Sequence, residues 1–187
     1  MRCEWSTSNE RMIEYHDTEW GTPVHDDQLL FEHLSLDGFQ AGLSWQTILN
    51  KRVNFRAAFD HFDPGLVAAY NSHKINELLA NPGIVRNRLK ITATIENARQ
   101  FLKIREEHGS FDAYIWGFTS GKTIHNSHST VNEIPAKTEL SDRISADLKK
   151  KGFTFVGSTI IYAFLQATGI VNDHVVHCFR YQELKND

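Results

Sequence analysis

The two cysteines of the chain lie near its opposite ends, and both ends also carry histidines. Together they supply a candidate set of four metal ligands: Cys3, His16, His174 and Cys178. Two thiolates and two imidazoles bind zinc in closed tetrahedral sites, which stabilise a fold and leave no position open for catalysis. Because His174 and Cys178 are four residues apart, we expect them on one face of a helix.

A second interpretation makes the cysteines buried thiols and the histidines incidental, since the chain has 10 histidines. The spacing of the four residues matches no standard zinc finger. His177 is a rival ligand beside Cys178. A disulfide is not expected in a cytosolic protein. Spacing alone therefore leaves both interpretations open.

Composition limits the class of protein. The chain of 187 residues is 41% apolar and 23% charged, as in ordinary soluble globular proteins. Its apolar runs are too short to cross a bilayer, and its N-terminal stretch lacks the apolar core of a signal peptide. We therefore expect a cytoplasmic protein without a membrane partner.

The net charge of −3 does not by itself indicate a nucleic-acid partner, because such proteins usually carry a basic surplus. Binding depends on local charge rather than on the total. The sequence offers three basic groups, at residues 51–52, at Arg86, Arg88 and Lys90, and at residues 149–151. Charge alone therefore leaves DNA binding open.

Helix signals dominate the elements that must position these residues. Residues that favour helix starts are Asp26 and Asp27, Ser44, Asp63 before Pro64, and Ser141. Gly38 is expected just past the end of the first of these helices. Helical patterns cover residues 88–105, 141–151 and 160–169, whereas residues 119–138 predict a long surface loop. Without strand alternation, the pattern predicts an all-α protein.

Five strings occur in order along the chain: MRCEW (1–5), YHDTEWG (15–21), QAGLSW (40–45), FVG (155–157) and VNDHVV (171–176). Together they closely resemble the bacterial DNA-3-methyladenine glycosylase I family of the helix-hairpin-helix glycosylase superfamily. The resemblance runs essentially end to end. It implies one two-lobed, all-α glycosylase domain over residues 1–187, with its hairpin at about 149–160. It also implies a single structural zinc ion that ties the termini together through Cys3, His16, His174 and Cys178.

The resemblance assigns the expected DNA-binding residues to a hairpin and a loop. Backbone N–H groups at a helix N-terminus bind phosphate, and glycine lets the phosphate approach closely. The superfamily's hairpin usually has a glycine, an apolar residue and a second glycine in a row. Here Phe155 stands in place of the first glycine. The loop, residues 40–43, resembles the family's wedge, which fills the gap left by an everted base. Without the resemblance, the hairpin is an ordinary helical corner and the loop a tight turn. The expected residues are Gln40, Gly42 and Leu43 in the loop, and Lys151, Val156, Gly157, Ser158 and Thr159 in the hairpin.

An enzyme that acts on a base must take it out of the duplex and hold it in a pocket. The resemblance places Trp5, Tyr15 and Trp45 around that base, while we expect Trp20 in the core. A 3-methyladenine nucleotide is cationic, so aromatic faces favour it over adenine. Asp37 is the expected catalytic and base-recognition residue, where the family is expected to have glutamate. A structural role at a helix end is its alternative.

The reaction implied is hydrolysis of the glycosidic bond of alkylated bases in double-stranded DNA, which starts base excision repair. Thr159 stands where bifunctional relatives carry a nucleophilic lysine, so no strand cleavage is expected. Asp173 is expected to orient His174 rather than to catalyse. We expect a monomer. The sequence does not determine the breadth of substrates beyond 3-methyladenine, for which 3-methylguanine is one candidate.

Two other functions remain in competition. The aspartate at position 37 motivates a catalytically diverged helix-hairpin-helix protein that binds damaged DNA. The acidic net charge motivates a zinc-stabilised helical interaction module unrelated to DNA. The wedge loop and the hairpin lysines argue against the second alternative.

Overall fold

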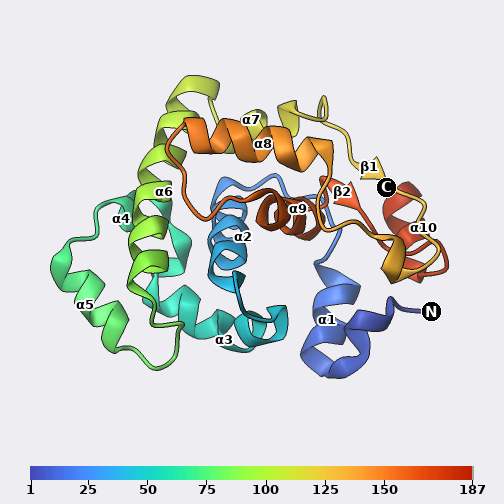
Figure 1. Ribbon diagram of the computed structural model, residues 1–187, viewed down its shortest axis with the longest axis horizontal. Coiled ribbons are helices and arrows are strands. Elements are labelled where there is room, and N and C mark those ends of the chain that lie inside the picture. The colour runs from blue at the N-terminus through green and yellow to red at the C-terminus, as the bar shows by residue number, and fades with distance from the viewer. Residues whose placement is uncertain (187) are drawn as a thin grey trace.

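The computed structural model describes residues 1–186 and is mostly helical within them (Figure 1). Its α-helices are α1 (Glu10–Thr18), α2 (Asp27–Gln40), α3 (Trp45–Ala58), α4 (Pro64–Ala68), α5 (Ser72–Ala80), α6 (Arg88–His108), α7 (Phe111–Gly117), α8 (Glu139–Lys150), α9 (Ser158–Ala167) and α10 (Phe179–Asn186). Three 3₁₀ turns are η1 (Glu4–Ser8), η2 (Asp60–Phe62) and η3 (Val131–Glu133). Two short strands, β1 (Ile124–His125) and β2 (Val171–Asn172), pair in parallel.

Side chains that cap helices fix most of the predicted starts. The Asp26 carboxylate accepts a hydrogen bond from the Leu29 N–H, and the Ser44 hydroxyl accepts one from the Thr47 N–H. Asp63 caps α4, with proline in the first turn. Each cap satisfies an N–H that the helix itself leaves unpaired. These predictions are confirmed.

Some predicted boundaries are wrong, and the predicted surface loop contains two short elements. Helix α2 continues through Gly38 to Gln40, so this glycine does not end the helix. A Cβ there would make an ordinary contact, 3.6 Å from the Phe155 side chain. Helix α8 is capped by Thr138, and Ser141 closes the reciprocal capping box three residues later. Residues 119–138 contain β1 and η3, which are too short to show a pattern in sequence.

Helix α2 runs through the middle of the molecule, with α6, α9 and α3 packed around it (Figure 1). Its residues 30–39 are all buried, including Phe31, Leu34 and Phe39 in the main core. A helix buried on every side shows no apolar stripe. It therefore also buries polar residues, among them Glu32, His33 and Asp37.

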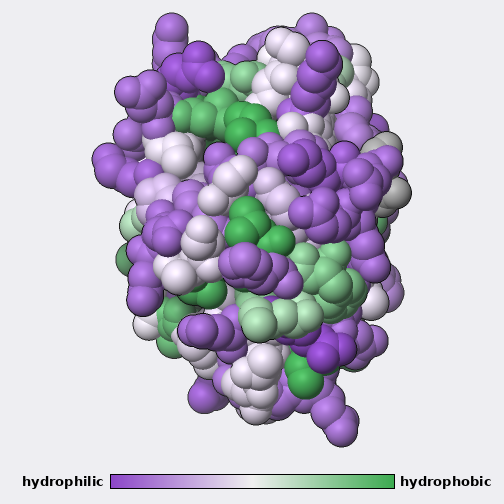
Figure 2. Space-filling view, turned by 90° about the vertical axis from the view of Figure 1, so that its right-hand side faces the viewer, coloured by the Kyte–Doolittle hydropathy of each residue, from purple (hydrophilic) through white to green (hydrophobic). Residues whose placement is uncertain are grey.

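A second buried cluster joins the two ends of the chain. Cys3 and Tyr15 pack there with Val175, Cys178 and Tyr181, and both termini lie on the right-hand side of Figure 1. Figure 2 shows this side of the surface as mostly hydrophilic, with small apolar areas between polar groups. Within residues 1–186, no helix is long and apolar enough to span a membrane.

Candidate active site and metal-binding group

The four predicted ligands come together in the second cluster. Cys3, His16, His174 and Cys178 are buried, and their ligand atoms all lie within 4.8 Å of one another. The Cys178 sulfur lies 3.4 Å from His16 Nε2 and 3.5 Å from His174 Nδ1. Ligands at zinc-bonding distances on a tetrahedron are about 3.3–3.8 Å apart. The donor set and these separations therefore suit a single metal ion held by all four side chains.

Separate elements supply the ligands. Cys3 precedes η1, His16 lies in α1, His174 follows β2, and Cys178 precedes α10. The expectation that His174 and Cys178 share a helix face is wrong, because these residues form a turn. The Cys178 N–H donates to the Val175 carbonyl over 2.8 Å, and this turn directs the sulfur back toward the histidine.

The outer nitrogen of each histidine ring has its own partner. His16 Nδ1 lies 2.8 Å from the Asp17 carboxylate, which also pairs with Arg2. His174 Nε2 lies 2.8 Å from the Trp20 carbonyl. Such partners fix which ring nitrogen faces the metal position. The expectation that Asp173 orients His174 is therefore wrong, since the Trp20 carbonyl has that role.

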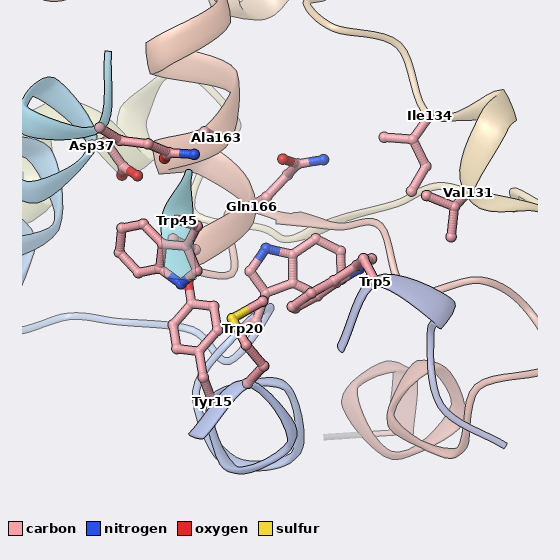
Figure 3. A pocket seen from close by; sticks show the side chains of 12 residues that line it. Trp5, Tyr15, Trp20, Asp37, Trp45, Val131, Ile134, Ala163 and Gln166 are labelled. Carbon is pink, nitrogen blue, oxygen red and sulfur yellow. The ribbon is translucent and has the colours of Figure 1, made fainter. Parts of the chain in front are cut away.

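A cavity of about 420 Å³ lies beside the candidate metal-binding group, from which Trp20 separates it. All four residues predicted to contact a base line it: Trp5, Tyr15, Asp37 and Trp45 (Figure 3). Its other lining residues are Met12, Trp20, Gln40, Val131, Ile134, Ala163, Gln166 and Ala167. This volume is in the range of small-molecule sites, and its aromatic walls suit a flat ring.

The aromatic walls rest on one another and on the metal-binding group. The ring centroids of Tyr15 and Trp45 are 5.1 Å apart, and those of Trp5 and Trp20 are 4.9 Å apart. Trp20 also packs edge-on against His174, with centroids 4.6 Å apart. The Trp20 side chain is buried, as expected, but it also lines the cavity. Through Trp20, the metal-binding group supports one wall of the cavity.

Asp37 directs a buried carboxyl group toward this cavity (Figure 3). Only 3% of the residue is exposed, and its Oδ2 has no hydrogen-bond partner among the described residues. Burial raises the pKa of Asp37 well above its usual value, partly opposed by the charge of Arg52. Because α2 continues to Gln40, Asp37 is inside the helix rather than at its end. An unpaired acceptor here can bind a donor or a cation brought by a ligand.

The loop between α2 and α3 carries the expected wedge. Gly42 has a φ of +77°, a left-handed conformation that favours glycine. Leu43 is 42% exposed, although it is a large apolar residue. Gln40, at the end of α2, lines the cavity. The loop therefore presents an apolar tip beside the mouth of the pocket.

The expected hairpin lies between α8 and α9. Gly157 precedes the first turn of α9, which contains Ser158 and Thr159, and no side chain caps that turn. A Cβ at Gly157 would have no heavy atom within 4 Å, apart from its chain neighbours. Val156 is buried, and its carbonyl accepts a hydrogen bond from Ser145. The hairpin therefore exposes backbone where a phosphate can approach.

The expected basic groups separate in the structure. Arg52 is buried in ion pairs with Glu19 and Glu32, and Lys90 is buried against the end of α2. The Lys151 ammonium lies 2.9 Å from Glu107 and sits over the Tyr114 ring. Arg86, Arg88 and residues 149–150 are exposed. Only part of the predicted basic surface is thus free to attract phosphates.

Comparison with known proteins identifies the family. The family model for methyladenine glycosylase matches residues 5–181. The DNA-3-methyladenine glycosylase 1 of Escherichia coli (strain K12) is 47% identical over 180 residues, which are 96% of each chain. The DNA-3-methyladenine glycosylase of Haemophilus influenzae is 42% identical over 177 residues, 95% of this chain and 96% of that protein. The chain belongs to the methyladenine glycosylase family.

Solved structures agree with this assignment. A crystal structure of 3-methyladenine DNA glycosylase I matches with a TM-score of 0.93 and 46% identity, over 96% of this chain and 98% of that chain. The glycosylase I from Staphylococcus aureus, in a structure describing 3-methyladenine recognition, matches with a TM-score of 0.92 and 34% identity. That match covers 95% of each chain. The mostly helical glycosylase fold expected from the sequence is confirmed.

Sequence reasoning missed part of the methyladenine glycosylase pocket. Ala163, Gln166 and Ala167 line it from one face of α9, and their helical spacing was the available signal. The Gln166 amide donates to the Asp173 carboxylate over 2.8 Å. Asp173 also accepts hydrogen bonds from Asn126 and Tyr162. The role of Asp173 is thus to hold a pocket residue, which no local pattern indicates.

Proposed function

We propose that this protein is a DNA-3-methyladenine glycosylase that hydrolyses the N-glycosidic bond of the damaged base and starts base excision repair. The observation that carries the proposal is the buried Asp37 carboxyl, without a partner among the described residues, inside an aromatic cavity. The relatives that match over nearly the whole chain are 3-methyladenine glycosylases. The partner is double-stranded DNA that contains alkylated bases.

Recognition uses the positive charge of the alkylated base. Trp5, Tyr15 and Trp45 offer aromatic faces to the everted ring, and a delocalised cation gains cation–π attraction that neutral adenine lacks. The Asp37 carboxyl accepts a hydrogen bond from the exocyclic amine. Because its pKa is raised in the empty pocket, a cationic base also favours the ionised carboxylate that binds it.

The chemistry demands little acid–base catalysis. The glycosidic C–N bond breaks, its electron pair goes to the base, and the cationic base leaves as neutral 3-methyladenine. The sugar carbon becomes cationic and is captured by water, which loses a proton to solvent. The protein supplies eversion, orientation and the negative charge of Asp37 near the developing cation. Thr159 has no amine to form a Schiff base, so the enzyme releases the base without cutting the strand.

Two elements bind the duplex around the lesion. The N-terminus of α9, at Gly157, Ser158 and Thr159, binds a backbone phosphate through its N–H groups. Leu43 enters the stack where the damaged base has left. Both contacts are independent of sequence, as a repair enzyme requires.

The four buried ligands hold one zinc ion. Thiolate and imidazole donors in a tetrahedral group are typical of structural zinc, and the measured separations fit it. When bound, zinc would neutralise the two thiolates, and Cys3 and Cys178 would share it as ligands from distant parts of the chain. Its effect on catalysis is indirect, through the Trp20 wall of the pocket.

The decisive test measures free bases released from methylated duplex DNA, resolved by chromatography, for wild type and Asp37→Asn. We expect wild type to release 3-methyladenine and the variant to release it at least about 10-fold more slowly, since it loses the charge but keeps the shape. Asp37→Glu is the matched control that keeps the charge. Wild type that binds this DNA and releases nothing would support the diverged DNA-binding protein instead.

A further inference from the structure

Lys90, in the first turn of α6, has a charged side chain that is buried. The residue is 8% exposed, unlike its neighbours Arg86 and Arg88, which are exposed. Its ammonium donates hydrogen bonds to the Phe39 carbonyl over 2.8 Å and to the Ala41 carbonyl over 2.5 Å. Both carbonyls lie at the C-terminal end of α2. Lys90 therefore contacts this helix end, and its burial makes it unsuited to binding a phosphate.

The end of α2 needs such a partner. The last carbonyls of a helix have no intrahelical donor and carry the negative end of the helix dipole. Glycine in a left-handed conformation usually closes a helix, but here the residue after α2 is Ala41, with φ −47° and ψ 116°. A lysine from a distant part of the sequence provides the missing donors and the opposite charge. Burial lowers the pKa of Lys90, and the two carbonyls offset that cost for the ammonium.

The anchored carbonyls lead directly into the wedge loop. Ala41 precedes Gly42 and Leu43, and the Leu43 N–H donates back to the Gln40 carbonyl. A Cβ at Gly42 would meet no heavy atom within 4 Å beyond its chain neighbours, and Leu43 is exposed. The loop tip is therefore placed by its two anchors, which are Lys90 on one side and the Ser44 helix cap on the other.

We propose that Lys90 is a positioning residue that fixes where Leu43 enters the base stack. The inference rests on the proposed glycosylase function and deepens it. Lys90 acts on eversion of the base from paired DNA, because the carbonyls that it binds lead into the loop. Lys90 does not itself line the pocket, and Gln40 is the lining residue nearest in sequence to its two partner carbonyls. The residues predicted to contact the base, Trp5, Tyr15, Asp37 and Trp45, lie outside the segment that it anchors, so it does not act on the chemistry of a base already in the pocket.

The test compares Lys90→Met with wild type in three assays. They are single-turnover excision of 3-methyladenine from a fully paired duplex, excision from a duplex with the lesion opposite an abasic-site analogue, and binding of free 3-methyladenine. An unopposed base costs less to evert. We expect excision from paired DNA to fall at least about 10-fold, because small misplacements cost rate steeply. On the unopposed lesion the loss should be about 3-fold or less, with free-base binding unchanged within about 2-fold.

Lys103→Met is the matched control, because it makes the same chemical change at an exposed position of the same helix. Lys90→Arg keeps the charged donors and should recover part of the rate. If Lys90→Met does not fold, Lys90→Gln retains one donor group and replaces it in all three assays. Equal losses on both duplexes, weaker free-base binding, or no loss on paired DNA would each overturn the proposal. Failure of wild type to excise at all would instead remove the proposed function.

Discussion

Helix α2 buries polar residues, and one of them, His33, makes the stability of the fold depend on pH. His33 is 3% exposed, and its Nδ1 has no partner among the described residues. Burial lowers the pKa of His33 to about 3, helped by the positive charge of Arg52. Glu32, beside it in sequence, is held ionised by Arg52 and Arg56. His33 is therefore neutral in the folded protein at every pH at which the enzyme is expected to work.

This histidine should weaken the fold in mild acid. Below pH 6.5 the unfolded chain binds a proton at His33, while the folded chain does not until about pH 3. The contribution of neutral His33 to the free energy of unfolding is thus fully present above pH 6.5 and is lost as the pH falls toward 3. We expect a loss of about 2 kcal/mol between pH 7 and pH 5. Urea unfolding at both pH values measures it.

His33→Gln is the control, because glutamine is polar, similar in size and uncharged. The variant should lose less unfolding free energy than wild type over the same pH interval. Equal slopes for the two proteins would show that His33 does not titrate differently on unfolding.

Individual residues also show which parts of the candidate site could be predicted from the sequence. Trp5, Tyr15 and Trp45 were placed at the base by resemblance, and they line the cavity. Lys90 was predicted only as part of a basic group and Gln166 was not predicted at all, because their roles depend on partners about fifty residues away or on a buried carboxylate. A side chain's type is visible in the sequence. Its partner is not, when helix packing alone brings the two together.

Gly157, at the start of α9, shows how a glycine that the backbone does not require can still serve binding. Gly157 has φ −61°, which any residue adopts, and a Cβ there would meet no atom within 4 Å beyond its chain neighbours. The backbone does not require glycine at this position. What glycine provides is a surface without a side chain in front of the first N–H groups of the helix.

Gly157→Ala should therefore separate folding from DNA binding. We expect unfolding free energy to be unchanged or to rise by up to about 1 kcal/mol, because alanine restricts the unfolded chain. Affinity for an abasic duplex should fall by about 10-fold, since the methyl group keeps the phosphate away. Urea unfolding and fluorescence anisotropy measure the two effects. Unchanged DNA affinity would show that the phosphate contacts α9 elsewhere.

Helix starts were easier to predict than helix ends. Asp26, Ser44 and Asp63 bond to N–H groups two or three residues ahead, so the signal is local. The carbonyls at the end of α2 are bound by Lys90, which is distant in sequence. The strands β1 and β2 gain their stability from pairing across the chain, so their two-residue segments carry no periodic signal.

For the whole molecule, the metal-binding group is the contact that connects the chain's ends to its pocket. Residue types and resemblance were sufficient to predict its four ligands. Their convergence in one buried group needed the structure, as did the contact of His174 with Trp20. Loss of the proposed ion would leave buried thiols and imidazoles without a common partner, and Trp20, which packs against Trp5, would lose its support.

Removing the metal should weaken the fold and the pocket together. We expect wild type to contain one zinc ion per chain and Cys178→Ser to contain none. The variant should lose about 3 kcal/mol or more, which corresponds to roughly 6–12 °C in the unfolding midpoint. Metal analysis and thermal unfolding measure these effects, with 3-methyladenine binding as the readout of the pocket.

A strong chelator should reproduce the loss in wild type and leave Cys178→Ser unchanged. Wild type that holds no zinc, or that unfolds at the same temperature with and without the chelator, would contradict a structural ion.

The joined ends also set the order in which the enzyme becomes competent during its synthesis. Trp5, Tyr15 and Trp20 are synthesised well before His174 and Cys178, which contact Trp20 and His16 in the folded protein. Helices α2 to α9 can form the main core before then. A nascent chain that has not yet reached Cys178 is therefore expected to lack a finished pocket, although its helices α8 and α9 are already made.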